Sequence, residues 1–557
     1  MLSTFIQHIL ITFLCLSAGF LFYKPAKDNR RKPLLFYFIT GLICISILAQ
    51  IACLFIPINE YFPLFFILII VIGIGVKRTD FYVFLRLVIQ HNTSHKWYYT
   101  ALLVSLWLLV LTLGTGPIMM DDTGSYHIQM IKWIEEYGTV PGIANLHERY
   151  GFNSSWFISI ASFNFFPGKM HSFSALNGLL SVWFCYYFID KAFKKDLPPS
   201  IKAASLLTIV LALVSWPLLR GNAATANYDS ITMLVVTVLF TEMIEKNTQK
   251  ESASFSIEYI LWPAYLFTVR IINFPILILM IIPIIEIIKH KNWRGLTRII
   301  IFPAILIIPF LWRNVILSGY PFYPSPYFDL FSVDWKTPKE VLDKLIYFIT
   351  YYNRVNNGFM DIETTAKLGN IKWVGPWFHY MFEYDKLVFL PGITGLITYL
   401  TITLRSVKRE GVKSLISCIT IIMAIASWFR IAPDPRFIYG FLISGSFFLF
   451  IFIFKKVIRQ NFTPVLSIIV LISVILFSIM KLKNSEYWNF VFTRPLPRPE
   501  VKKAMINGIE FNIPGKVEGN WNERCYETSL PCLYSIYPGL EPRGRNIKDG
   551  FRIRKQN

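Results

Sequence analysis

Charged residues are scarce in this sequence: they make up 16% of its 557 residues, against about a quarter in soluble domains. Hydrophobic residues account for 54% of the chain and aromatic residues for 17%. Apolar runs of roughly 15 to 25 residues recur along it, which is the length that a membrane-spanning helix requires. The composition argues against an ordinary soluble protein and predicts an all-α polytopic membrane protein.

Acidic residues are also few, with 34 Asp and Glu against 55 Lys and Arg, so the formal net charge is +21. Many of the basic residues lie in short gaps between apolar runs, such as "KPAKDNRRK" (24–32), "KHKNWRGLTR" (289–298) and "RSVKREGVK" (405–413). These gaps alternate with gaps poor in Lys and Arg, which is the positive-inside pattern. The charge therefore indicates orientation and contact with anionic lipid head groups, not binding to nucleic acid. With every basic gap in the cytoplasm, both termini fall outside it.

Several chemical motifs are missing as well. The sequence has no glycine-rich nucleotide-binding loop, no nucleophile elbow and no zinc-binding His-Glu motif. Of its seven cysteines, five lie in apolar runs, and Cys525 and Cys532 lie close together in a polar C-terminal tail. A disulfide between these two fits a tail outside the cytoplasm. A zinc pair is the alternative, although no further Cys or His follows them.

The apolar runs predict about fourteen helices, in a bundle of about 12–14 membrane spans. Their rough positions are 4–23, 33–56, 62–76, 97–117, 170–190, 201–219, 231–245, 257–270, 272–288, 298–317, 387–404, 413–430, 437–454 and 464–480. This pattern divides the chain into extra N-terminal helices (1–96), a membrane module (97–317), an outer loop (318–386), C-terminal helices (387–480) and a tail (481–557).

Three large segments then lie on the outer face, and these segments carry the unusual residues. The first outer segment is 118–169, the second is 318–386, and the third is the tail from about residue 481. The second outer segment contains a predicted amphipathic helix from Pro338 to Arg354. We expect the function to reside on this face.

The first outer segment begins with an acidic pair inside the stretch "GTGPIMMDDTGSYHIQMIKWIEEYG" (114–138). Apolar residues at helical spacing after the pair predict a helix lying along the membrane interface. Asp122 or Ser125 can cap that helix, but a second adjacent acid at a membrane boundary is costly unless it is used. Asp121 or Asp122 is therefore a candidate general base. For His127, we expect a neutral hydrogen-bonding role over metal ligation.

Four further stretches place arginines at the outer ends of apolar runs. They are "LLRGNAATANYDSITMLVV" with Arg220 and Asp229, "YLFTVRIINFP" with Arg270, "WRNVILSGYPFYP" with Arg313, and "RIAPDPRFIYGFLISG" with Arg436. A guanidinium suits phosphate oxygens because its planar fork donates two parallel hydrogen bonds. Structural roles remain open: Arg220 and Asp229 can pair two helix ends, Arg270 can reach the interface, and Arg436 can flank a loop.

Taken in order, these motifs resemble the GT-C superfamily of membrane glycosyltransferases over about residues 97 to 480. The resemblance implies a helical membrane domain whose first large outer loop carries the catalytic carboxylate, and a polyprenyl- or dolichyl-phosphate sugar as donor. The last stretch departs from the family pattern, because Phe437 replaces the usual Tyr and the downstream Pro is missing. Residues 1–96 and the tail lie outside the resemblance.

The expected function is that of a bacterial inner-membrane glycosyltransferase, inverting, with its site and both termini in the periplasm. It would transfer a sugar from a polyprenyl-phosphate donor to a glycan, lipid or protein acceptor. Asp121 is preferred over Asp122 as the base because Asp122 is better spaced to cap the helix. The predicted substrate contacts are His127, Arg220, Asp229, Arg270, Arg313 and Arg436.

No cofactor is expected for this reaction, with a divalent metal at the acid pair as the alternative. Two other classes remain open. An O-antigen polymerase or ligase would depend on Arg and His in a late loop. A transporter or flippase of a lipid-linked glycan would need charges near the bilayer midplane, whereas most charges here lie at the outer boundary.

Overall fold

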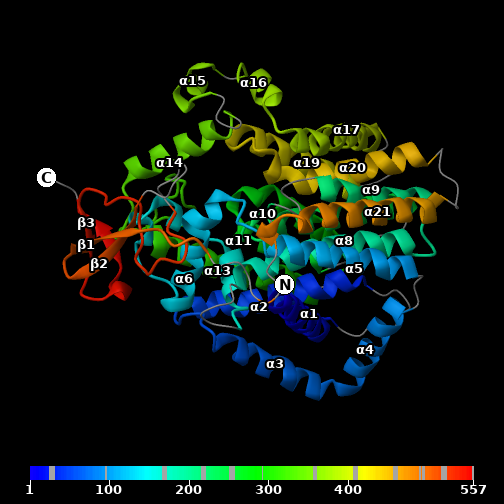
Figure 1. The fold of residues 1–557 in the computed structure, drawn as a ribbon, viewed down its shortest axis with the longest axis horizontal. Coiled ribbons are helices and arrows are strands. Elements are labelled where there is room, and N and C mark those ends of the chain that lie inside the picture. The colour runs from blue at the N-terminus through cyan, green and yellow to red at the C-terminus, as the bar shows by residue number, and fades with distance from the viewer. Residues whose placement is uncertain are drawn as a thin grey trace.

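The computed structural model describes residues 1–23, 32–93, 97–165, 172–214, 221, 223–249, 257–291, 293–355, 360–369, 371–405, 412–455, 462–487, 491, 496–515 and 524–554. These residues form a helical bundle with two small antiparallel sheets at one end (Figure 1). One continuous hydrophobic core runs through the bundle and reaches the tail, since it includes both Ile11 and Phe551.

Nine of the described helical segments are long and apolar enough to cross a membrane, and the protein is a polytopic membrane protein. They are α1 (Leu2–Phe22), α2 (Leu34–Cys53), α5 (Trp97–Gly114), η5 with α12 (Ile271–Met280 and Ile281–Lys289), α13 (Trp293–Ser318), α17 (Glu383–Arg405), α19 (Val412–Ile431), η6 with α20 (Pro435–Ile438 and Tyr439–Phe454) and α21 (Phe462–Leu482). A tenth span results if α3 (Phe62–Val76) and α4 (Arg78–Thr93), which are bent by 100°, are counted as one.

Four further helices that the sequence predicted as spans are present among the described residues. These are α8 (Ser172–Phe193), α9 (Pro199–Val214), α10 (Asp229–Gln249) and α11 (Glu258–Val269). They form as expected, but they are shorter or less apolar than the nine. Every residue of α11, for example, is buried. A helix enclosed by other helices does not face lipid, so it tolerates polar residues such as Asn177 and Thr237, both fully buried.

The N-terminal helices are part of the bundle core. His8 on α1 accepts a hydrogen bond from Trp107 on α5 (3.0 Å), and Trp262 on α11 donates to Thr40 on α2 (3.2 Å). Residues 1–96 therefore pack into the same core as the membrane module.

The first outer segment folds into short helices at one end of the bundle. It contains η1 (Thr123–His127), α6 (Ile128–Glu136), η2 (Ile143–Asn145), η3 (Glu148–Gly151) and α7 (Ser155–Ala161). The predicted interfacial helix exists as α6, but its apolar stripe does not face lipid. Met130, Trp133 and Ile134 are fully buried, so the stripe packs against protein.

The second outer segment contains α14 (Lys339–Tyr352), α15 (Ile362–Lys367) and α16 (Val374–His379). The predicted amphipathic helix is confirmed as α14, which buries Leu342 and Leu345.

The tail is ordered by hairpins and by contact with the first outer segment. It contains η7 (Ser485–Tyr487), β1 (Val501–Ile506), β2 (Ile509–Pro514), β3 (Leu540–Pro542), η8 (Ile547–Asp549) and β4 (Phe551–Ile553). Strand β1 pairs with β2 and β3 with β4, both antiparallel. Asn507 and Gly508 connect the first pair with positive φ angles, as a tight two-residue hairpin turn requires.

The predicted disulfide between Cys525 and Cys532 is present. Beside it, the side chain of Gln129 on α6 donates to the carbonyls of Tyr526 and Thr528, both at 2.9 Å. In Figure 1 the tail accordingly lies at the same end of the bundle as α6. The tail and the first outer segment form one packed unit.

Helices α17 and α20 approach each other most closely at glycines. A Cβ atom built on Gly395 would lie 1.9 Å from the carbonyl oxygen of Gly445, and one on Gly445 would lie 2.3 Å from the carbonyl oxygen of Gly392. Small residues allow this backbone contact, which drives helix association in membranes.

We expect Gly395→Ala to destabilise the protein by about 1–3 kcal/mol, because the added methyl group must push two backbones apart. Gly75 on α3 is the matched control, since a Cβ there meets nothing within 4 Å. Gly75→Ala should be neutral or slightly stabilising, because Ala favours helix over Gly. Thermal unfolding of both variants in detergent checks this, and equal melting temperatures would contradict the packing argument.

Candidate functional site

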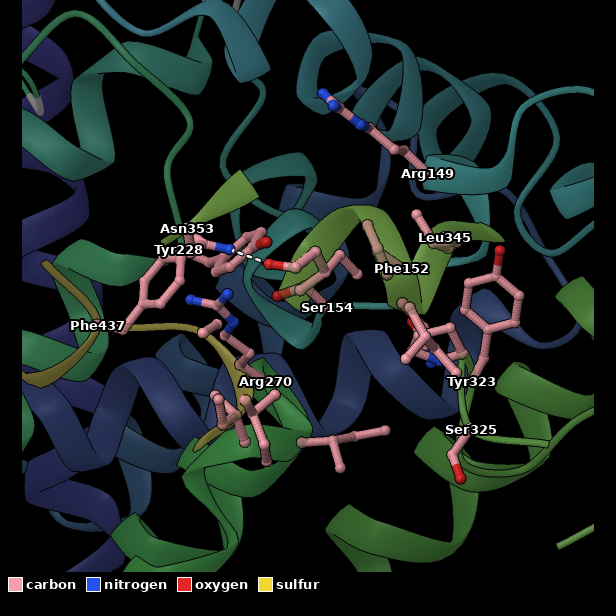
Figure 2. Close-up of a pocket in the computed structure, with 18 of the residues that line it drawn as sticks. Arg149, Phe152, Ser154, Tyr228, Arg270, Tyr323, Ser325, Leu345, Asn353 and Phe437 are labelled. Carbon is pink, nitrogen blue, oxygen red and sulfur yellow. Dashed lines mark hydrogen bonds between the residues drawn. The ribbon is translucent and has the colours of Figure 1, made fainter. Parts of the chain in front are cut away.

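A cavity of about 450 Å³ lies where several candidate spans end. Arg270 precedes the span that begins at Ile271, Arg436 lies at the start of the span from Pro435, and Ile431 ends the span α19; all three line the cavity. The first outer segment and α14 supply further lining residues. Figure 2 shows Arg270, Tyr228 and Phe437 on one side and Tyr323, Ser325 and Leu345 on the other. If these spans cross a bilayer, the cavity therefore lies at one of its faces.

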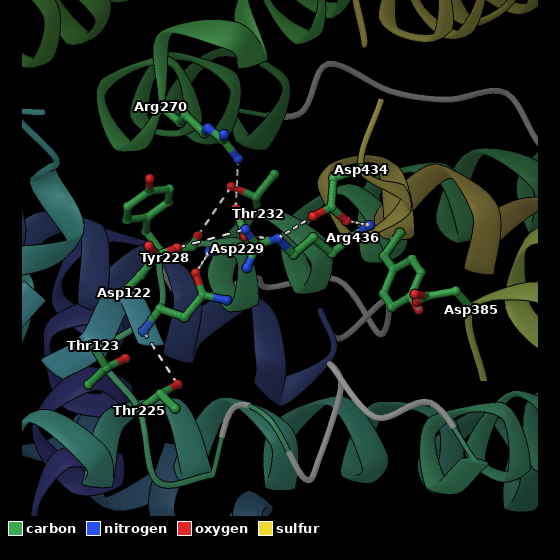
Figure 3. A network of polar contacts seen from close by, with 12 residues as sticks. Asp122, Thr123, Thr225, Tyr228, Asp229, Thr232, Arg270, Asp385, Asp434 and Arg436 are labelled. Atoms are coloured by element: carbon green, nitrogen blue, oxygen red, sulfur yellow. Dashed lines mark hydrogen bonds and ion pairs between the residues drawn. The ribbon is translucent and has the colours of Figure 1, made fainter. Parts of the chain in front are cut away.

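Five charged residues from distant parts of the chain meet in this cavity, and we call them, together with Asp434, the ion network. Figure 3 shows its members Asp122, Asp229, Arg270, Asp434 and Arg436. Arg149 Nη1 lies 3.1 Å from Asp122 Oδ1, and Arg270 Nη1 lies 3.0 Å from Asp229 Oδ1. Arg436 joins the two pairs: it lies 3.7 Å from Asp122, 3.8 Å from Asp229 and 2.9 Å from Asp434. Positive and negative groups alternate, so each charge has an opposite neighbour.

The structure thus brings together four residues predicted from the sequence: Asp122, Asp229, Arg270 and Arg436. Arg313 is buried elsewhere, with 1% of its surface exposed, and donates to Thr139 and Asn153. Arg313 does not line the cavity. Its guanidinium instead connects helix α13 to the first outer segment. Arg220 lies outside the described residues.

The two acids of the pair have different surroundings. Asp121 is 65% exposed at its side chain and pairs with Arg524 of the tail. Asp122 is 32% exposed at its side chain and lines the cavity. It occupies the N-cap position of η1 but makes no side-chain capping bond, so the reason for preferring Asp121 as the base does not hold. Of the two acids, Asp122 is the one that lines the cavity.

The ion network shifts the pKa values of its two cavity carboxylates in opposite directions. Burial would raise the pKa of Asp122, but the charges of Arg149 and Arg436 outweigh burial and lower it. Burial dominates at Asp229 and raises its pKa, although Arg270 and Arg436 oppose this. A charge next to several guanidiniums is stabilised, so these arginines favour the ionised form of Asp122.

Aromatic rings lie against the guanidiniums. The guanidinium carbon of Arg270 lies 3.6 Å from the centroid of Phe437 and 5.4 Å from that of Tyr228, and that of Arg436 lies 5.0 Å from Phe437. Cations are attracted to ring faces. Phe437, where the resembled family has Tyr, thus contacts both arginines through its ring and needs no hydroxyl to do so.

His127 lies behind the cavity wall. It is 1% exposed, and its Nδ1 lies 3.3 Å from the hydroxyl of Thr123. Burial lowers the pKa of His127 to about 3. The ring is therefore neutral near pH 7. The sequence predicted a substrate contact at His127, but this residue is not among those that line the cavity.

The sequence analysis missed Arg149 and Asp434. Arg149 lies in the first outer segment, and Asp434 is two residues before Arg436, which the sequence analysis had singled out. The available signal was the presence of further charges at the outer boundary, where each charge is costly unless paired. Nothing in the local spacing indicated which of them would point inward.

The pairing of Arg270 with Asp229 predicts a coupled effect on stability. Arg270→Gln leaves a mostly buried carboxylate without its nearest cation, so we expect a loss of about 3 kcal/mol. The double variant with Asp229→Asn should lose less than the sum of the single variants. A double-mutant cycle on thermal or denaturant unfolding measures this, and additivity within about 0.5 kcal/mol would contradict the pairing.

The buried His127 predicts a pH effect. An unfolded chain binds a proton at His127 below about pH 6.5, whereas the folded protein binds it only near pH 3. Neutral His127 therefore does not reduce the free energy of unfolding above about pH 6.5. Below that pH the free energy of unfolding falls, until the folded protein also binds the proton near pH 3. His127→Gln should flatten the pH profile of the melting temperature in this window. His379→Gln, at an exposed position, should keep the wild-type profile; identical profiles for all three proteins would refute the assignment.

Comparison with known proteins gives one match. A family model described as "Domain of unknown function (DUF8201)" matches residues 1–443, which include the whole ion network but not residues 444–557. No curated protein and no solved structure matches the chain. Because the match covers most of the sequence, the chain belongs to the DUF8201 family of unknown function.

Proposed function

We propose that this protein is a membrane glycosyltransferase with a GT-C-like bundle. It transfers a sugar from a polyprenyl-phosphate donor to an acceptor hydroxyl or amide, with inversion, at the periplasmic face of a bacterial inner membrane. The observation that carries the proposal is the cavity, in which guanidiniums and a partly exposed carboxylate adjoin apolar residues at the ends of membrane spans.

The two kinds of lining suit the two parts of such a donor. Ile271, Ile272 and Phe274 line the cavity and belong to a candidate span. A hydrocarbon tail can lie against these residues while its phosphate reaches Arg270 and Arg436. Guanidiniums bind phosphate through charge-assisted hydrogen bonds, which strengthen in a partly desolvated site.

The reaction follows from these positions. Asp122 removes the proton from the acceptor group, whose oxygen or nitrogen then attacks the anomeric carbon of the sugar. The bond from that carbon to the carrier phosphate breaks, and the phosphate leaves with the electron pair. Arg270 and Arg436 stabilise the negative charge that develops on the leaving phosphate. In this scheme the arginines neutralise the leaving group, so no metal is required.

Donor binding also prepares the base. In the empty cavity, Arg149 and Arg436 lower the pKa of Asp122, and a carboxylate so stabilised is a weak base. When Arg436 turns to the donor phosphate, the charge beside Asp122 is partly neutralised and its pKa rises. The base is therefore strengthened only when the donor is present.

The central test compares the two acids of the pair. Asp122→Asn should lower transfer by about 10²–10⁴-fold, because the amide cannot accept the proton. Asp121→Asn should keep most of the activity, since Asp121 pairs with the tail outside the cavity. The assay follows radiolabelled sugar from the polyprenyl-phosphate pool of the source membranes into the products of reconstituted protein.

Equal loss in both variants would count against Asp122 as the base. Movement of intact lipid-linked sugar across proteoliposomes, with no new glycosidic bond and no effect of Asp122→Asn, would instead support a transporter.

A further inference from the structure

The cavity has a second wall, which the ion network does not explain. It consists of residues Phe322–Tyr327 and the inner face of α14, and we call it the aromatic wall. Its rings belong to Phe322, Tyr323, Tyr327, Phe348 and Tyr352, and its polar groups, on Ser325, Thr350 and Asn353, are uncharged. Among the described residues that line the cavity, every charged side chain belongs to the ion network.

The aromatic wall leads from the proposed base to the outer surface. The guanidinium of Arg149, which holds Asp122, lies 5.9 Å from the ring of Phe348. Phe348 stacks on Tyr352 with centroids 5.0 Å apart and planes inclined by 19°. Tyr352 is 48% exposed and Tyr327 is 89% exposed. A group bound along these rings would therefore reach Asp122 from outside the membrane.

This wall is distinct from the lipid side of the cavity. The apolar residues on that side belong to a candidate span, whereas α14 and residues 322–327 belong to none of the candidate spans. A donor tail and a second substrate can thus occupy opposite walls with the ion network between them.

We propose that the aromatic wall binds the neutral sugar units of a glycan acceptor, an inference that rests on the proposed function and names its acceptor class. A pyranose ring presents a C–H face that packs on aromatic rings, and edge hydroxyl groups that bond to side-chain amides and hydroxyls. A wall of rings with a few uncharged polar groups matches that chemistry.

A peptide acceptor fits this wall less well. A peptide that adds as a strand to a sheet edge is bound through main-chain hydrogen bonds, but the described part of this wall consists of α14 and a turn. The backbone groups of α14 are used within the helix. A strongly charged polymer would find charge partners only in the ion network, which the phosphate of the proposed donor occupies.

The test uses two tyrosines of the same helix. Tyr352 lines the cavity and is 48% exposed, whereas Tyr347 is 44% exposed and does not line it. Full-length protein in lipid nanodiscs is titrated with neutral oligosaccharides (maltohexaose, cellohexaose and xylohexaose), with hexagalacturonate, and with a Gly-Ser peptide. Calorimetry gives the affinity, and saturation-transfer NMR shows which ligand protons contact the protein.

We expect a neutral oligosaccharide to bind with its C–H protons in contact. Tyr352→Ala should weaken this binding about tenfold, the equivalent of one lost ring contact, and Tyr347→Ala should change it less than about twofold. Absence of binding by all three neutral oligosaccharides, equal effects of the two variants, or tighter binding of the acidic oligosaccharide or the peptide would overturn the inference.

A parallel titration with undecaprenyl phosphate separates this inference from the proposed function. Loss of undecaprenyl phosphate binding in Arg436→Ala, with no change in Tyr352→Ala, agrees with both. If Tyr352→Ala weakens undecaprenyl phosphate binding and leaves oligosaccharide binding intact, the wall belongs to the donor and the inference is wrong. If oligosaccharide binding depends on Tyr352 while Arg436→Ala leaves undecaprenyl phosphate binding unchanged, the inference stands and the proposed donor is wrong.

Discussion

Arg436 contacts three carboxylates that come from different parts of the chain, and the arrangement of the cavity depends on it. Asp434 lies two residues before it, Asp122 is in the first outer segment, and Asp229 begins α10. Partly buried charges are costly unless they are paired. The three acids therefore hold Arg436 between them, and Arg436 in turn links the ends of two helices and one outer segment around a common space.

The bundle supplies the rigid frame for this arrangement. Close glycine contacts between α17 and α20 hold the helix that follows Arg436. The interior helices α8 to α11 carry the polar residues that a lipid-facing helix could not. Such a frame allows charged side chains from remote segments to be held a few ångströms apart.

The sequence predicted the membrane bundle well because long apolar runs and basic gaps are strong, local signals. It also predicted that Asp122, Asp229, Arg270 and Arg436 gather, since each lies at the outer end of an apolar run. It could not separate Asp121 from Asp122, because the difference comes from Arg524, about 400 residues away. Nor could it show that Arg313 is used inside the core, since an intramembrane arginine has the same sequence context whether it faces a ligand or a neighbouring helix.

Of the described helices, nine or ten have the length and apolar content of a membrane span, and the four interior helices do not reach both. Apolar side chains can contact either protein or lipid. The sequence alone therefore does not distinguish a helix enclosed by other helices from one that faces lipid. The tail shows the same limit of local patterns. Its hairpin turn at Asn507 and Gly508 is a local sequence signal, but its packing against α6 depends on contacts between residues far apart in the sequence.

The disulfide between Cys525 and Cys532 links the orientation of the protein in the membrane to the redox state of the compartment that holds the tail. Such bridges persist where the surroundings are oxidising, and the loop that this one closes lies directly against the segment bearing Asp122. Whichever compartment oxidises these two sulfurs is thus the compartment into which the cavity opens. A pair of thiols consequently reports membrane orientation, independently of the distribution of lysine and arginine.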